Sequence, residues 1–203
     1  GSILRTDSNT FAVTGKGSIN GKDKLYFAGA HAFNNFSLSA VVDGNAVLAV
    51  KDSASNNAAG YYVCIQNGNL SVYKRGAYGE KAEKLTDVAV SGKTAVRIVR
   101  MSGGELQAFT APVSENSTGE WAKVENSSCR LNISENVLAG FAPLKGKAIL
   151  SQVELKPLEK QYGEDFENNP LGSMFTTNAD KKQYAVSNGK LTINPEGKTL
   201  YFL

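Results

Sequence analysis

Short segments in which apolar and polar residues alternate recur along this chain, and each one is closed by turn residues. Residues 36–42 place four apolar side chains on one face of an extended strand and two serines on the other. Similar segments occupy residues 46–50, 61–65, 70–74, 94–100, 106–109, 137–142 and 148–155. No segment repeats its apolar residues with a helical period. Many short strands at a spacing of about 8–12 residues predict an all-β fold, a two-sheet antiparallel β-sandwich of the jelly-roll type.

The composition is that of a globular domain. Of the 203 residues, 41% are hydrophobic and 20% are charged, which excludes a disordered tail or a membrane-spanning protein. No apolar run approaches the roughly 18 residues of a spanning helix, so we expect no membrane insertion, and any signal peptide has been removed or never existed. The formal net charge of +3 is spread along the chain, and we therefore expect no nucleic-acid partner.

Two segments far apart in the sequence resemble each other. The segment from Phe11 reads FAVTGKGSINGKDKLYF and the segment from Tyr184 reads YAVSNGKLTINPEGKTLYF. Ile19-Asn20 aligns with Ile193-Asn194 when single-residue insertions are allowed. We therefore expect residues 1–158 to form one sandwich and residues 159–203 to begin a second, similar repeat in a chain cut from a longer protein. The alternative is that the C-terminal strands complete the first sandwich.

The clearest local prediction is a β-hairpin around Asn67-Gly68, a dipeptide that favours the positive φ angles of a two-residue type I′ turn. Pairing across this turn places Val63, Ile65, Leu70 and Val72 on a core face. The opposite face carries Tyr62, Cys64, Gln66, Asn69, Ser71 and Tyr73, with Arg75 on the same side.

This second face has the chemistry of a sugar-binding surface. Aromatic rings stack on the C–H faces of sugars, amides bind hydroxyl groups, and arginine can hold the carboxylate of an acidic sugar. The candidate ligand-binding residues are therefore Tyr62, Tyr73, Gln66, Asn69 and Arg75. The alternative is that the tyrosines complete the packing of the second sheet.

Trp121, the only tryptophan, is a further candidate for sugar stacking because it lies in the polar segment 114–128. The alternative is that it anchors this loop to the core. The single histidine, His31, has no sequence partner that would orient it as a base, so we expect a structural or surface role.

Metal-binding and cysteine patterns are sparse. Glu164, Asp165 and Glu167 form the densest carboxylate group, which could bind calcium or could belong to a solvated strand. We therefore expect no cofactor, and a structural calcium ion is the alternative. Cys64 and Cys129 lack zinc-site spacing, and one disulfide or two buried free thiols would explain them equally well.

The order of four segments resembles the concanavalin A-like lectin/glucanase modules, the laminin-G-like jelly rolls. These segments are FSLSAVV, AGYYVCIQNGNLSVYK, TAVRIVRMSGGELQAF and VLAGFAPLKGKAILSQVEL, and they cover residues 36–155. The EDFE motif at residues 164–167 also looks like the opening of such a module. The resemblance implies secretion and carbohydrate contact. Glucanase members carry glutamates around an aspartate on one strand, and alginate-lyase-like members carry Gln-x-His, but this chain has neither Glu-x-Asp nor Gln-x-His.

Taken together, these features predict a non-catalytic carbohydrate-binding module of a multidomain, polysaccharide-using bacterial protein that is secreted, periplasmic or displayed on the cell surface. Its expected partners are a polysaccharide or oligosaccharide and the other domains of its parent chain. A structural spacer or adhesion module without sugar binding is the first alternative. A glycoside hydrolase or polysaccharide lyase with an unfamiliar site is the second.

Overall fold

The computed structural model describes residues 1–115, 117–158, 184–187 and 190–193. The chain divides into two compact units, Gly1–Glu159 and Lys160–Leu203. In the second unit, β14 (Tyr184–Ser187) pairs antiparallel with β15 (Lys190–Ile193). Whether this unit begins a second repeat stays a prediction. Among the described residues, no helix has the length and apolar character needed to cross a membrane.

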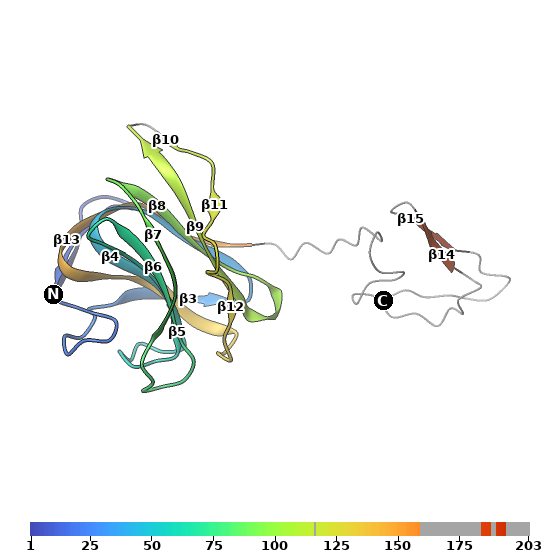
Figure 1. The fold of residues 1–203 in the computed structure, drawn as a ribbon, viewed down its shortest axis with the longest axis horizontal. Helices are drawn as coiled ribbons and strands as arrows, with labels where there is room; N and C mark the ends of the chain where they lie inside the picture. The colour runs from blue at the N-terminus through green and yellow to red at the C-terminus, as the bar shows by residue number, and fades with distance from the viewer. Residues whose placement is uncertain (116, 159–183, 188–189, 194–203) are drawn as a thin grey trace. The chain divides into compact units, whose positions relative to one another are not determined.

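The first unit consists of strands and one short 3-10 turn at Ser102–Gly104 (Figure 1). Its strands are β1 (Ser2–Arg5), β2 (Phe11–Gly15), β3 (Ala28–Phe33), β4 (Phe36–Lys51), β5 (Gly60–Gln66), β6 (Asn69–Arg75), β7 (Glu83–Ala89), β8 (Thr94–Arg100), β9 (Glu105–Ser114), β10 (Ser117–Thr118), β11 (Ala122–Lys123), β12 (Cys129–Arg130) and β13 (Asn136–Pro157). All of their pairings are antiparallel, which confirms the predicted all-β class.

Two long bent strands, β4 and β13, divide the unit into two layers. The first half of β4 pairs with β8 and its second half pairs with β5. The first half of β13 pairs with β3 and its second half pairs with β2. We name the layer with β3, β5, β6 and β7 sheet A, and the layer with β1, β2, β8 and β9 sheet B. Both sheets contain half of β4 and half of β13, which pair with each other along their lengths.

The bends correct one detail of the sequence prediction. Residues 36–42 and 46–50 were expected to be separate strands, as were residues 137–142 and 148–155, but each pair forms a single strand. Gly44 and Gly146 have φ angles of 108° and 120°, and Asn45 Nδ2 donates a hydrogen bond of 2.9 Å to the carbonyl of Lys145. The turn residues therefore bend the strands without ending them.

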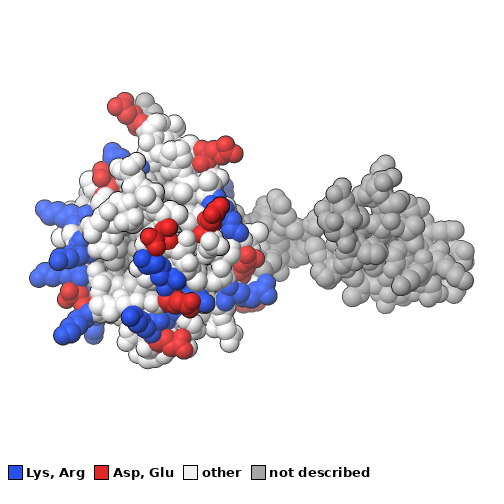
Figure 2. Space-filling model, viewed as in Figure 1, with Lys and Arg blue, Asp and Glu red and all other residues white. Residues whose placement is uncertain are grey.

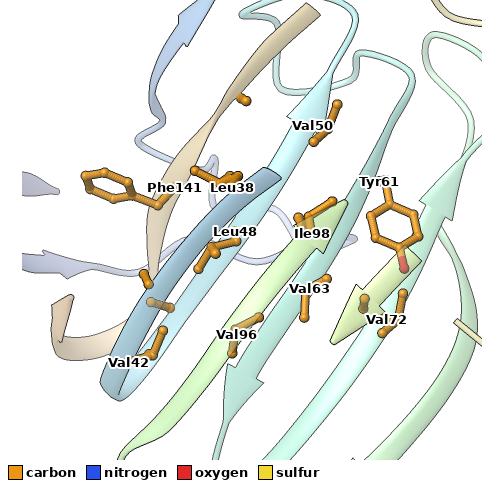
Figure 3. Packing of buried hydrophobic residues seen from close by; sticks show 14 of the residues in the cluster. Leu38, Val42, Leu48, Val50, Tyr61, Val63, Val72, Val96, Ile98 and Phe141 are labelled. Carbon is orange, nitrogen blue, oxygen red and sulfur yellow. The ribbon is translucent and has the colours of Figure 1, made fainter. Parts of the chain in front are cut away.

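The main core lies between the two sheets. Sheet A contributes Leu48, Val50, Tyr61, Val63 and Val72, and sheet B contributes Leu38, Val42, Val96 and Ile98 (Figure 3). Full burial of such side chains stabilises the fold by about 1.5–3 kcal/mol each. Tyr61 also donates a hydrogen bond of 2.7 Å to the carbonyl of Ser127, so its hydroxyl is satisfied inside the core.

The segment at residues 16–27, which we name the covering loop, packs on the outer face of sheet A. Leu25 is buried there, and Ile19 and Phe27 pack beside it, against the outward side chains of β4 and β5. Asn20 fastens the loop to the segment before β7 through two hydrogen bonds with the backbone of Ala82, of 2.7 and 2.8 Å. Part of the outer hairpin face is therefore hidden from solvent.

Candidate functional site

The hairpin formed by β5 and β6 has the predicted register. Tyr62 lies opposite Tyr73, and Gln66 lies opposite Asn69. The turn residues Asn67 and Gly68 have φ angles of 52° and 77°, as a type I′ turn requires. The inner side chains belong to the main core, so the predicted division of the hairpin into two faces is confirmed.

Two of the predicted ligand-binding residues are buried beneath the covering loop. Tyr62 is 0% exposed and Arg75 is 4% exposed. Tyr62 donates a hydrogen bond of 3.0 Å to the carbonyl of Ala58, and burial raises the pKa of its hydroxyl. Arg75 donates to the carbonyls of Asn56 and Ile19 at 2.7 and 2.9 Å. Both side chains therefore hold the loops in place, and we assign neither of them a ligand contact.

The other three predicted hairpin residues line an open pocket of about 400 Å³, which we name the hairpin pocket. Its walls come from the covering loop, the hairpin, β7 and β13. The lining residues are Ser18, Ile19, Asn20, Cys64, Gln66, Asn67, Asn69, Ser71, Tyr73, Lys84 and Leu144. The structure thus brings Gln66, Asn69 and Tyr73 together and adds polar groups from two other elements.

Polar side chains without hydrogen-bond partners among the described residues lie beside an aromatic ring in this pocket. Within the described part of the chain, the side chains of Gln66, Asn69 and Ser71 make no hydrogen bond. The half-buried ring of Tyr73 lies 5.8 Å from the ammonium group of Lys84. Lys84 in turn lies 3.5 Å from the carboxylate of Asp87. A ring with free amides and a hydroxyl around it can stack on a sugar and bind its hydroxyl groups.

The sequence analysis did not identify Ser18, Asn20 and Lys84 as site residues. Ser18 and Asn20 reach the pocket because the covering loop crosses to β6 and β7, some distance away in the chain. Asn20 belongs to the segment from Phe11 that resembles the segment from Tyr184. This repeat was therefore the sequence signal that could have indicated Asn20 as a site residue. Lys84 carried no distinguishing pattern.

Trp121 lies on the other sheet. It is half-buried and packs with Val41, Ala95 and Ala111 on the outer face of sheet B. The guanidinium carbon of Arg97 lies 4.0 Å from the centre of its ring. Trp121 and the hairpin pocket therefore do not form one site.

The remaining candidates are distributed over the unit. Cys64 and Cys129 are both free thiols. Cys64 lies on the outer face of sheet A, whereas Cys129 packs against the inner core. Burial raises the pKa of Cys64, and raises that of Cys129 to about 11. His31 is exposed, with Nδ1 at 3.0 Å from the amide oxygen of Asn136.

The predicted calcium ligands Glu164, Asp165 and Glu167 lie outside the described residues. Within the described ranges, no group of three or more His, Cys, Asp or Glu side chains is arranged to hold a metal ion.

No family model matches the sequence, and no curated protein matches it. The exoplasmic/lumenal domain of VIP36, solved in a Ca²⁺/Man3GlcNAc-bound form, is 13% identical over 81% of this chain and 87% of that chain, with a TM-score of 0.51. A legume lectin-like domain from Entamoeba histolytica is 13% identical over 78% and 88%, with a TM-score of 0.48. The carbohydrate-binding module CBM66 from Bacillus subtilis is 11% identical over 77% and 91%, with a TM-score of 0.43.

The VIP36 domain has the highest TM-score of these three structures, and at 13% identity the likeness establishes the fold alone. The predicted two-sheet antiparallel β-sandwich of the jelly-roll type is thereby confirmed as the fold of the first unit.

Proposed function

We propose that this concanavalin A-like β-sandwich is a non-catalytic carbohydrate-binding module and that its hairpin pocket binds the sugar. The observation that carries the proposal is the set of unpaired polar side chains of Gln66, Asn69 and Ser71 beside the ring of Tyr73. The pocket volume of about 400 Å³ falls in the range of small-ligand sites. The VIP36 domain, which shares the fold, was solved with Man3GlcNAc bound, and this supports a glycan as the ligand class.

The proposed setting is a multidomain, polysaccharide-using bacterial protein that is secreted, periplasmic or displayed on the cell surface. The division of the chain into two compact units supports a modular parent protein. The second candidate function is that of a structural spacer without sugar binding. The division into two compact units supports it equally.

Isothermal titration against a panel of neutral and acidic oligosaccharides tests the sugar-binding proposal. We expect Tyr73→Ala and Asn69→Ala each to weaken binding of the preferred sugar by about tenfold, because each removes a stacking or hydrogen-bonding contact of about 1 kcal/mol or more. Asn132→Ala is the matched control, since Asn132 is also an exposed asparagine without a side-chain hydrogen bond among the described residues.

Two results would contradict the proposal. A folded protein that gives no heat with any sugar would favour the spacer function. Turnover of a polysaccharide would show an enzyme instead. Repeating the titrations with a chelator tests whether binding depends on calcium, for which Glu164, Asp165 and Glu167 are the proposed ligands.

A further inference from the structure

A second hollow, of about 800 Å³, lies where β2 ends and β13 bends. We name it the lysine hollow, because Lys16, Lys24, Lys145 and Lys147 line it together with Asp23 and Tyr26. These side chains come from the covering loop, which begins directly after β2, and from the bend of β13. None of the six lines the hairpin pocket.

The charged side chains that line this hollow are mostly positive. All four lysines are exposed, and the ion pairs among the described residues involve only Lys74 and Lys84. Among the described residues that line it, Asp23 is the only acidic one. Figure 2 shows basic side chains gathered along the edge of the first unit at which the chain begins. Such a concentration of unpaired positive charge attracts anionic ligands.

The backbone holds three of the lysines close to one position of the sheet. Gly15 pairs with both Lys145 and Gly146, which is a β-bulge, and Lys147 pairs with the preceding residue, Thr14. Lys16 follows Gly15 directly. Bulges redirect side chains on a fixed strand framework, and a site on strands is better preorganised than a site on a mobile loop.

An exposed aromatic ring lies in the hollow together with the lysines. Tyr26 is 55% exposed and lines the same hollow as the lysines. We propose that the lysine hollow is a second binding site, separate from the hairpin pocket, for a carboxylate-bearing polysaccharide. The ammonium groups pair with carboxylates on successive sugars, and the ring of Tyr26 stacks on a sugar face. A single ring favours this ligand over single-stranded nucleic acid, whose successive bases stack on several aromatic side chains.

Titration with a short oligogalacturonate at low ionic strength tests this site. We expect Lys145→Ser combined with Lys147→Ser to weaken binding by about tenfold, because two charge contacts are lost. The fully methyl-esterified oligomer keeps the sugar chain but lacks the charge, so it should not bind. Affinity of the unaltered protein should fall as salt rises.

Matched variants separate this site from general charge and from the hairpin pocket. Lys93→Ser combined with Lys123→Ser removes the same charge from exposed positions outside the hollow and should leave the affinity unchanged. Tyr26→Ala should weaken binding, whereas Tyr73→Ala should not. Thermal unfolding of each variant checks that it is folded.

Four results would overturn the proposal. These are no binding of the oligogalacturonate, equal binding of its ester, equal weakening by the two lysine pairs, and tighter binding to single-stranded DNA or to phosphatidylserine vesicles than to the oligogalacturonate. None of these results contradicts sugar binding in the hairpin pocket. The two proposals can therefore be overturned separately.

Discussion

At the scale of single residues, Lys51 is unusual because it is a fully buried cation. Its side chain is 0% exposed, and its ammonium group lies 3.3 Å from the carbonyl oxygen of Ala54 and 4.5 Å from the centre of the Phe27 ring. Burial, with a smaller contribution from Arg75, lowers its pKa to about 8. No carboxylate among the described residues forms an ion pair with it, so charging Lys51 opposes folding.

Lys51→Met tests this penalty. The unfolded chain takes up a proton at a pKa near 10.5, but the folded chain does so only near 8. The unaltered protein therefore loses stability as the pH falls from about 10.5 to 8, and the loss is complete below pH 8. We expect the variant to be more stable by about 3 kcal/mol at pH 7, with an advantage that shrinks toward zero near pH 10.5.

Urea unfolding of both proteins across this pH range measures the difference in their free energies of unfolding. Both proteins contain the same cysteines, so the effect of cysteine ionisation cancels in this difference. A stability difference that does not change with pH would contradict the assignment. Lys93→Met is the control for the loss of an exposed lysine.

At the scale of elements, the bend in β4 determines how the two sheets are joined. A Cβ atom on Gly44 would lie 2.4 Å from the carbonyl oxygen of Lys147 and 2.9 Å from the Cα of Ala148. The φ angle of 108° is also unfavourable for residues with a side chain. Glycine is therefore required where β4 passes from sheet B to sheet A beside β13.

We expect Gly44→Ala to lower the free energy of unfolding by about 3 kcal/mol, since it combines backbone strain with a steric clash. Gly92→Ala is the matched control, because Gly92 has a φ of 62° but no atom within 4 Å of the added Cβ. That substitution should cost only about 1 kcal/mol. Equal losses in chemical denaturation would show that the close approach to β13 contributes nothing.

At the scale of the whole molecule, the covering loop decides which part of sheet A reaches solvent. Asn20 is its polar attachment to the segment before β7. Beneath the loop, Cys64 is buried, with 5% of the residue exposed. The loop thus separates the buried tyrosine, Tyr62, from the open pocket at Tyr73.

Asn20→Ala should release this loop, because two hydrogen bonds of about 1 kcal/mol each are lost. In a Cys129→Ser background, we expect a thiol reagent to label Cys64 about tenfold faster in the Asn20 variant, since labelling requires local opening. Asn132→Ala in the same background should label at the unaltered rate. An unchanged rate in the Asn20 variant would mean that apolar packing of Leu25 alone holds the loop.

Local interactions explain what could be predicted from the sequence. The turn at Asn67-Gly68 and the two faces of the hairpin follow from backbone preferences within a few residues. The same alternation predicted β8 at residues 94–100. The bends at Gly44 and Gly146 were interpreted as strand ends, because a glycine in a turn and a glycine in a bend have the same local pattern.

The sequence by itself determined the all-β class, the hairpin register and the candidate residues Gln66, Asn69 and Tyr73. Only the tertiary structure decided that Tyr62 and Arg75 are buried and that lysines from the covering loop and from β13 share one hollow. Alternation specifies which side of a strand a residue occupies, but it does not specify which distant segment packs on that side. The covering loop makes that choice through contacts between residues far apart in the chain, and no local pattern encodes them.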